Sequence, residues 1–261
     1  MFPNFKLHEG IYFLTQKKHN FSSIYLNVRK KEGRVYSDAM VKHLPYLSKN
    51  HIHYREWKFR QKSFERFIKY LSKKKNNQKI LDLGCGNGWF SNSIATHVPS
   101  TEVIGLDINE YELKQASRIF YKDNLKFAFA DIFELEYPVL ENEFDLIVLN
   151  ASLQYFPDCK ALWTVLKTFL KSNGEIHILD SPFYNKEDIQ SAKQRTIDYY
   201  TKLGFPEMIE NYFHHSRQCV KEFEVMYTPA NILTKKMLRI DDSPFYWFKK
   251  HYRDDLSYGK K

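Results

Sequence analysis

The chain has 261 residues and a formal net charge of +9, with 43% hydrophobic and 16% aromatic residues. This length suits one globular domain with an extension, and the apolar content excludes a chain that is disordered throughout. No run of about 18 apolar residues is present to span a bilayer. The first ten residues, MFPNFKLHEG, lack the apolar core and small-residue cleavage site of a secretion signal, so we expect a cytoplasmic protein.

Charge is distributed unevenly along the sequence. Residues 1–79 carry 19 Lys and Arg against 5 Asp and Glu, a net charge of +14. Residues 80–180 carry 7 against 15, a net charge of −8, and residues 181–261 carry 14 against 11. Such asymmetry is typical of a chain whose basic part recruits an acidic partner, although a lysine-rich surface also serves solubility alone.

The three cysteines are odd in number and far apart in the sequence, at Cys85, Cys159 and Cys219. We therefore predict neither a disulfide framework nor a zinc cluster. No acidic cluster has the spacing of metal ligands, so no metal site is expected.

Helix-like and strand-like segments alternate from residue 54 onward. A helix is expected over 54–71, where apolar residues recur on one side. Short apolar strands are expected over 79–83, 103–106, 125–130, 144–149 and 175–179, separated by helices over 89–97, 110–121 and 158–171, the last ending in a left-handed cap at Gly174.

A largely helical segment over 186–212, interrupted near 203–206, and strands over 223–227 and 245–249 complete the prediction. Alternating strands and helices predict an α/β fold with a mostly parallel, Rossmann-like sheet and helices on both faces. We divide the chain into an N-terminal helical extension and lid, residues 1–78, and a main domain, residues 79–261.

A glycine-rich turn, Asp82-Leu83-Gly84-Cys85-Gly86-Asn87-Gly88, links the first strand of this domain to its first helix. Glycine permits the tight turn and lets a ligand approach the backbone. Asp107 ends the next strand, where a carboxylate can accept hydrogen bonds from ribose hydroxyls. A dinucleotide fingerprint needs a small residue where this chain has Trp89, which disfavours a nicotinamide or flavin dinucleotide.

The segments ILDLGCGNG, VIGLDIN, FADIF and FDLIVLNASLQYF stand in this order over residues 79–156. Together they resemble the motif set of the class I S-adenosylmethionine (SAM) dependent methyltransferases. The resemblance, which extends to about residue 181, implies a seven-stranded sheet whose last strand is antiparallel. It also implies SAM as the cofactor and S-adenosylhomocysteine as its product.

Ten positions would form the cofactor site by this resemblance, and an eleventh is added as a separate hypothesis. The glycine turn, at Asp82, Gly84, Cys85 and Gly86, would line the methionine end. Asp107 would hold the ribose, with Ile108 packed on the adenine. The remaining assignments are Asp131 and Ile132 at the adenine, Asn150 and Ala151 near the amino group and methyl, and, as a separate hypothesis, Arg60 on the carboxylate.

A methyl group on a sulfonium is already activated, so alignment supplies much of the acceleration and a base is needed only for a protonated acceptor. His214 and His215 are candidate general bases, against the alternative that they are packed or surface side chains. Aromatic residues near 54–60 and 183–213 predict an acceptor pocket built by the extension and the segment after the fifth strand.

The favoured function is methyl transfer to a small-molecule or lipid-like acceptor, anionic or delivered by an acidic carrier protein. One alternative is an RNA methyltransferase whose basic N-terminal segment follows the phosphate backbone. The other is a non-catalytic module that binds SAM or a protein.

Overall fold

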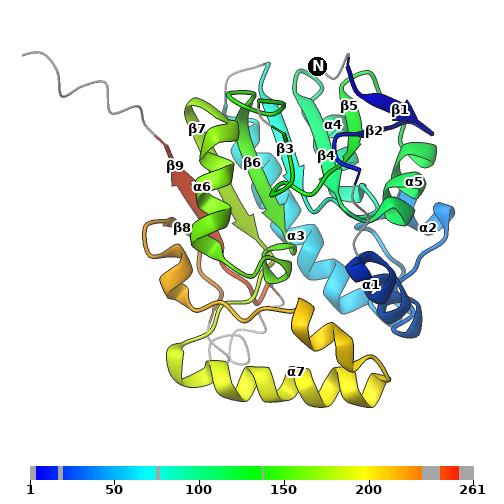
Figure 1. The fold of residues 1–261 in the computed structure, drawn as a ribbon, viewed down its shortest axis with the longest axis vertical. Coiled ribbons are helices and arrows are strands. Elements are labelled where there is room, and N and C mark those ends of the chain that lie inside the picture. The colour runs from blue at the N-terminus through cyan, green and yellow to red at the C-terminus, as the bar shows by residue number, and fades with distance from the viewer. Residues whose placement is uncertain (1–3, 17–19, 75–76, 137, 231–241, 253–261) are drawn as a thin grey trace, which may run out of the picture.

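The computed structural model describes residues 4–16, 20–74, 77–136, 138–230 and 242–252 (Figure 1). Within these residues one nine-stranded sheet has the order β1-β2-β5-β4-β3-β6-β7-β9-β8. The strands are β1 Lys6–His8, β2 Ile11–Phe13, β3 Lys79–Leu83, β4 Glu102–Asp107, β5 Leu125–Phe129, β6 Phe144–Asn150, β7 Leu170–Leu179, β8 Glu224–Tyr227 and β9 Trp247–His251.

Helices connect the strands and cover the sheet. The α-helices are α1 Asn20–Lys31, α2 Asp38–His43, α3 Tyr54–Leu71, α4 Trp89–His97, α5 Glu110–Ile119, α6 Cys159–Phe169 and α7 Ile189–Leu203. Short 3-10 helices are η1 Leu153–Tyr155, η2 Lys186–Asp188, η3 Pro206–Asn211 and η4 Arg217–Val220. No helix of the described segments is both long and apolar enough to cross a membrane.

The predicted Rossmann-like sheet is confirmed, because β5, β4, β3, β6 and β7 are parallel and β9 lies antiparallel between β7 and β8. Two strands were not expected: β1 and β2 form a hairpin, and β2 extends the sheet in parallel beside β5. At three residues each, these strands are too short to show a periodic pattern. The hairpin belongs to the predicted N-terminal extension, yet it joins the sheet of the predicted main domain. The division of the chain between residues 78 and 79 therefore stays a prediction. Both chain ends lie outside the described residues.

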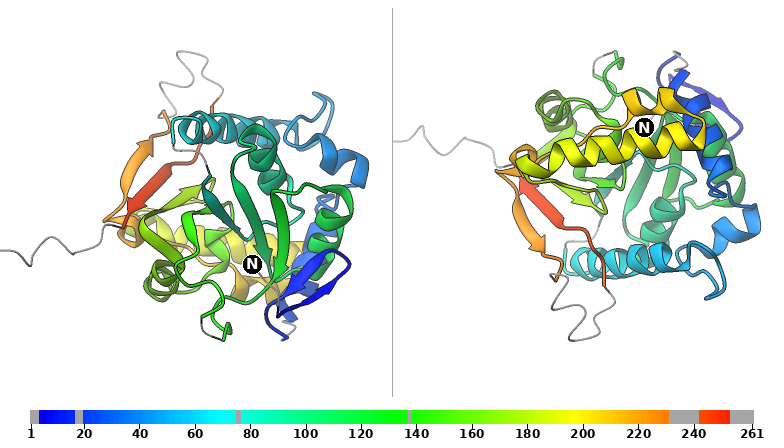
Figure 2. Two further views of the ribbon diagram at one scale, coloured as in Figure 1. Left: turned by 90° about the horizontal axis from the view of Figure 1, so that it is seen from above. Right: turned by 90° about the horizontal axis from the view of Figure 1, so that it is seen from below.

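Successive residues of the central strands enter two different hydrophobic cores. Ile80 packs with α3, α4 and α5 on one face of the sheet, whereas the next residue, Leu81, packs with α6 on the other. Figure 2 shows α3 and α6 on opposite sides of the sheet. Strands buried on both faces explain the continuous apolar runs that the sequence shows there.

A third cluster lies at the carboxyl ends of the strands, where α7 crosses beneath the sheet (Figure 1). Val28 of α1, Tyr200 of α7 and Met208 of η3 form its buried centre. Gly204 ends α7 in the left-handed region (φ 90°), as the interruption near 203–206 predicts. We call α1, α7 and η3 the cap.

Two predictions are wrong. The helix over 158–171 does not end at a left-handed Gly174: α6 ends at Phe169, β7 begins at Leu170, and Asn173 takes the positive φ of 62°. The second wrong prediction is that the cysteines form no disulfide: Cys159 and Cys219 are joined by one across 60 residues of sequence. Cys85 is a free, buried thiol.

Candidate functional site

The glycine turn brings the backbone of three strands into close contact. Gly84 has a φ of 77°, and a Cβ added there would lie 2.5 Å from Cβ of Ser152. The Ser152 hydroxyl donates to the carbonyl of Leu83 at 2.7 Å, and the amide of Gly84 donates to the carbonyl of Leu106 at 2.8 Å. Glycine is therefore required at position 84 both for its conformation and for the approach of the loop after β6.

Asp107 joins the end of β4 to this turn. Its Oδ2 accepts from the amide of Gly86 at 2.7 Å, and its Oδ1 accepts from the amide of Asn109 at 2.8 Å. Burial raises the pKa of Asp107 above its usual value, and the backbone N–H groups oppose that rise. The carboxylate thus fixes the turn and also faces the cavity at the carboxyl ends of the strands.

Two more carboxyl groups lie near Asp107. Burial raises the pKa of Asp82 to about 7, with repulsion from Asp107 adding to the effect and the Ser91 hydroxyl opposing it. Burial and Asp107 likewise raise the pKa of Glu112 on α5 to about 7, against the attraction of Arg29. One buried acid, Asp82, and two half-buried acids in one place favour a cationic ligand, because a positive charge would stabilise their ionised forms.

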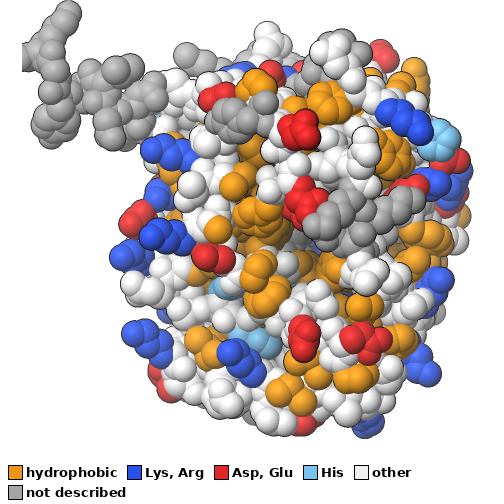
Figure 3. Space-filling view, in the orientation of Figure 1, with side chains coloured by type: hydrophobic (Ala, Val, Ile, Leu, Met, Phe, Trp, Pro, Cys, Tyr) orange, Lys and Arg blue, Asp and Glu red, His pale blue; other side chains and the backbone are white. Residues whose placement is uncertain are grey.

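Two cavities adjoin these groups, and a third lies next to both of them. The turn cavity, of about 100 Å³, lies around the glycine turn and reaches Trp57 and Arg60 of α3. The strand-end cavity, of about 370 Å³, lies at the ends of β4 and β5 and the loop after β6. The cap cavity, of about 750 Å³, lies between α3, α7 and the loop after β7. In the orientation of Figure 1, Figure 3 shows hydrophobic side chains gathered over the middle of the visible face.

The structure brings all eleven predicted cofactor positions to the first two cavities. The turn cavity is lined by Arg60, Asp82, Gly84, Cys85, Gly86, Asn150 and Ala151. The strand-end cavity is lined by Asp107, Ile108, Asp131 and Ile132, and shares Gly84, Gly86 and Ala151 with the turn cavity. Residues from four strand ends and one helix thus meet as the sequence motifs indicate.

Ala151 lines all three cavities. It has a φ of 56°, which is uncommon for a residue with a Cβ, and its amide donates to the carbonyl of Leu179 at 2.9 Å. Strained backbone of this kind persists where the surroundings hold it, often at functional sites. Ala151 therefore marks the junction of the cavities.

Arg60 lines the turn and cap cavities but already has a carboxylate partner. Its Nη2 lies 3.1 Å from Oε1 of Glu56, and its guanidinium stacks over the Trp57 ring at 5.2 Å. Although burial opposes the change, Arg60 and Arg34 lower the pKa of Glu56 to about 2. Arg60 is held at the mouth of the turn cavity by this pair.

The two predicted histidines line none of the three cavities. His214 contacts the Thr196 hydroxyl at 2.8 Å through Nε2, and its ring packs against Tyr184 and Tyr212. His215 is buried, with Nε2 3.2 Å from the carbonyl of Leu153 and Nδ1 3.3 Å from Sγ of Cys159. Burial lowers the pKa of both rings.

Sequence reasoning missed two acids of the site. Asp180 directly follows the end of β7, much as Asp107 ends β4. A carboxylate at the end of a strand was therefore the sequence signal that could have identified Asp180 as a site residue. Asp180 lines the cap cavity, accepts from the Ser63 hydroxyl at 2.7 Å through Oδ1, and leaves Oδ2 without a hydrogen-bond partner among the described residues. Glu112 lies within α5, where the sequence offered no such signal.

The residues present fit a SAM-like ligand. Oδ1 of Asp82 and Oδ1 of Asn150 are buried and have no hydrogen-bond partner in the described part of the chain. Buried acceptors without donors are costly, and a ligand ammonium group would supply donors to such oxygens. The acidic turn and Asp107 complete a polar surface suited to an amino group and a ribose.

Comparison with known proteins identifies the family. A family model described as "Methyltransferase domain" matches residues 74–234. The chain belongs to this methyltransferase family. It is 33% identical over 100 residues to a malonyl-[acyl-carrier protein] O-methyltransferase of Acetivibrio thermocellus, covering 38% of this chain and 34% of that protein. A sterol 24-C-methyltransferase of Debaryomyces hansenii is 24% identical over 189 residues, covering 70% of this chain and 48% of that protein.

The chain thus spans between a third and a half of the length of these curated methyltransferases. Solved methyltransferases share the fold. A geranyl diphosphate C-methyltransferase from Streptomyces coelicolor A3(2), solved with S-adenosyl-L-homocysteine, has a TM-score of 0.57 and 13% identity, covering 91% of this chain and all of that one. Haemonchus contortus phosphoethanolamine N-methyltransferase 2, also solved with S-adenosylhomocysteine, has a TM-score of 0.52 and 18% identity, covering 76% of this chain and 46% of that one.

The raised pKa of Asp82 predicts a pH-dependent effect on stability. The ligand-free native protein keeps a proton on Asp82 up to about pH 7, whereas the unfolded chain loses it near pH 4. This group therefore stabilises the native state at low pH and loses that contribution as pH rises through about 7. We expect Asp82→Asn to gain free energy of unfolding relative to wild type between pH 5 and pH 8, measured by urea denaturation.

The exposed Asp123, changed to Asn, is the matched control for which no such gain is expected. A difference between Asp82→Asn and wild type that is equal at both pH values would contradict a buried, protonated Asp82.

Proposed function

We propose that the chain transfers a methyl group from SAM to a small-molecule or lipid-like acceptor that carries an anionic group. The observation that carries this proposal is the meeting of three cavities at Ala151: two lined by the predicted cofactor residues and a larger third lined by arginines and aromatic rings. An acceptor in the cap cavity would reach the cofactor site at this junction.

By the family resemblance, the strand-end cavity would take the adenosine, with Asp107 on the ribose and Asp131 and Ile132 at the adenine. The turn cavity would take the methionine part, with Asp82 and Asn150 near its amino group and Arg60 near its carboxylate. SAM, when bound, supplies an activated methyl group on a sulfonium. The protein's own task is then to align the acceptor with that methyl in line and to exclude water.

Positive charge in the cap cavity supports an anionic acceptor. Five arginines line it, four of them from the basic N-terminal segment: Arg29, Arg34, Arg55, Arg60 and Arg195. Three of them, Arg29, Arg34 and Arg60, form ion pairs with Glu32 or Glu56. Among the described residues, Arg55 and Arg195 form no ion pair with a carboxylate, so they are available for a carboxylate or phosphate of the acceptor.

Aromatic walls support an apolar body behind that anionic group. Tyr155, Tyr184, Tyr200, Tyr212 and Phe245 line the cap cavity together with Pro182 and Pro244. Two of the related methyltransferases are named for anionic acceptors, a malonyl-carrier protein and geranyl diphosphate. A carrier-bound acyl group would likewise combine an anionic group with an apolar chain.

Asp180 is placed to accept a proton from the acceptor. It follows β7 directly, next to Leu179, whose carbonyl binds the amide of Ala151, and its free Oδ2 belongs to a side chain that lines the cap cavity. Burial raises the pKa of Asp180 to about 6, opposed by Arg60 and the two serine hydroxyls that it contacts. We propose Asp180, in place of His214 or His215, as the base for a hydroxyl or amine acceptor.

The first prediction concerns the cofactor. Asp107→Ala should bind SAM at least about 100-fold more weakly, because two hydrogen bonds to a charged acceptor are lost, each contributing about 1.5–3 kcal/mol. Isothermal titration calorimetry measures this, with Asp123→Ala as control. Wild-type affinity in Asp107→Ala would place the ribose elsewhere, and absence of SAM binding by the wild type would overturn the enzyme proposal.

The second prediction concerns the acceptor. Formation of S-adenosylhomocysteine is measured with a malonyl-carrier protein, geranyl diphosphate, phosphomonomethylethanolamine, an uncharged sterol and a tRNA transcript. An anionic small or carrier-bound compound should be turned over, and Arg55→Ala with Arg195→Ala should raise its KM by about tenfold or more while SAM affinity stays unchanged. Turnover of the sterol or of tRNA alone would refute the anionic small-molecule class.

The third prediction concerns Asp180. Asp180→Asn should lower kcat by about 100-fold or more, while SAM affinity remains within about twofold. The wild-type rate should rise with pH through about 6, because the base must be ionised, and this rise should be absent in Asp180→Asn. A variant that keeps the wild-type kcat and the same rise with pH would show that Asp180 is not the base.

A further inference from the structure

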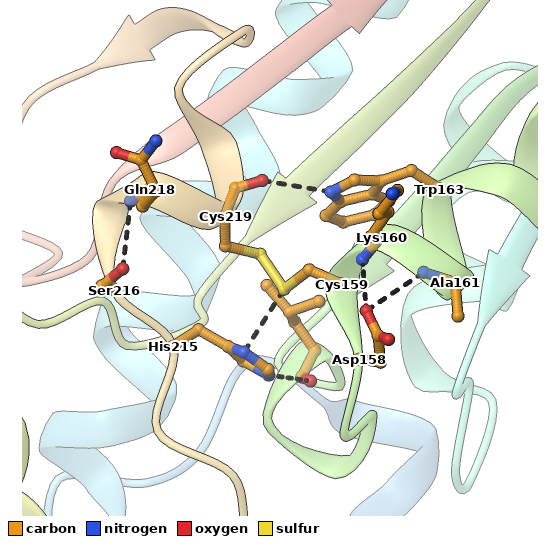
Figure 4. Close-up of a disulfide and its surroundings, with 10 residues drawn as sticks. Asp158, Cys159, Lys160, Ala161, Trp163, His215, Ser216, Gln218 and Cys219 are labelled. Carbon is orange, nitrogen blue, oxygen red and sulfur yellow. Dashed lines mark hydrogen bonds between the residues drawn. A yellow bond between two sulfur atoms is a disulfide. The ribbon is translucent and has the colours of Figure 1, made fainter.

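The disulfide between Cys159 and Cys219 lies beside a buried histidine (Figure 4). Cys159 is the first residue of α6, after the N-cap Asp158, and Cys219 lies in η4. Nδ1 of His215 is 3.3 Å from Sγ of Cys159. The two sulfurs and one ring nitrogen all lie within 4.8 Å of one another.

The hydrogen bond on the other side of the ring fixes its tautomer. Nε2 of His215 lies 3.2 Å from the carbonyl of Leu153, and a carbonyl can only accept, so Nε2 carries the proton. The residue is 8% exposed, so protein encloses the ring on most sides. Nδ1 therefore directs a lone pair at Cys159.

A disulfide leaves that lone pair without a donor, because neither sulfur carries a hydrogen. In the reduced chain, the same three atoms become two thiols and an imidazole nitrogen that converge on one point. An imidazole whose second nitrogen donates to a backbone carbonyl is the usual arrangement around a metal-ligating histidine. The surroundings of His215 thus suit a metal ligand better than they suit a neighbour of a disulfide.

We propose that Cys159, Cys219 and His215 bind a soft divalent metal ion, zinc by the chemistry of its ligands, when the disulfide is reduced. Two thiolates and one imidazole provide three of the four tetrahedral positions of zinc, and water completes the set. This site lies apart from the three cavities of the proposed function and does not depend on that function.

The chemistry balances with a dithiol as the reductant. The dithiol gives two electrons and two protons to the Cys159–Cys219 bond, forming two thiols, and becomes a disulfide itself. Zinc binding then releases both thiol protons to solvent, because thiolates are the ligands. Disulfide and metal-bound forms exclude each other, since both use the same sulfur electron pairs.

Either form would join the start of α6 to η4, the 3-10 helix that follows the cap in the chain. The segment before Cys159 includes Tyr155, Phe156 and Pro157, which line the strand-end cavity. The segment before Cys219 includes Phe213, whose amide donates to the carbonyl of Gln154 at 2.8 Å. The two segments that meet at the Cys159, His215 and Cys219 cluster therefore also build the walls of the cofactor and acceptor cavities.

The test loads the whole protein with metal under reducing conditions. After reduction by an immobilised dithiol, the protein is dialysed against zinc, and bound zinc is measured by elemental mass spectrometry. We expect one zinc per reduced chain and none per oxidised chain. Cobalt in place of zinc should give the thiolate-to-cobalt charge-transfer band in the near ultraviolet, which adventitious surface sites lack.

Cys159→Ser, Cys219→Ser and His215→Gln should each lose at least about 100-fold in zinc affinity. His214→Gln, a change at the neighbouring histidine that contacts Thr196 instead, should retain the wild-type affinity. A folded, reduced wild-type protein that takes up no stoichiometric zinc and shows no cobalt–thiolate band would overturn the proposal. The wild-type cobalt spectrum decides the outcome even where a variant fails to fold.

Discussion

The carboxylate of Asp107 holds the glycine turn against the end of β4, and the rest of the site depends on this contact. Its two oxygens accept hydrogen bonds from the amides of Gly86 and Asn109. The first bond positions the turn and the second begins α5, whose N-cap is Asn109. Since α5 carries Glu112, one aspartate places both the glycine backbone and a second, half-buried acid beside the strand-end cavity.

Much of the fold was predictable because its signals are local. The α3 bounds and the five parallel strands follow from apolar runs, each read within a few residues. The cofactor positions were assigned by the family resemblance, with Arg60 as a separate hypothesis, and they stay predictions, although all of them line the turn cavity or the strand-end cavity. The disulfide could not be predicted in this way: Cys159 and Cys219 are 60 residues apart, and the cap that brings them together has no sequence motif. The β1–β2 hairpin was missed because three-residue strands carry almost no periodic signal.

Part of the excess positive charge of the N-terminal segment lies in the wall of the cap cavity. Arg29, Arg34 and Arg60 form a chain of ion pairs with Glu32 and Glu56 along the cap cavity. Three arginines against two glutamates leave one positive charge, to which Arg55 adds another. Part of the net positive charge is therefore concentrated in a partly enclosed cavity and does not only serve solubility. The low dielectric of such a cavity strengthens the attraction between each unpaired positive charge and an anion.

The cap cavity exists only because segments distant in sequence support one another. Nη2 of Arg29 on α1 donates to the Tyr155 hydroxyl at 2.8 Å, which connects the N-terminal segment to the loop after β6. Tyr199 of α7 donates to Oε1 of Glu32 at 2.6 Å, and Glu32 also binds Arg29. These bonds join α1, α7 and the loop after β6 through a few charged side chains, which alone would open readily in water. The disulfide between Cys159 and Cys219 lies at the end of the same loop, where α6 begins. It limits how far the segment that includes Phe213 and Cys219 can separate from that loop, so these walls of the strand-end cavity remain close to Ala151.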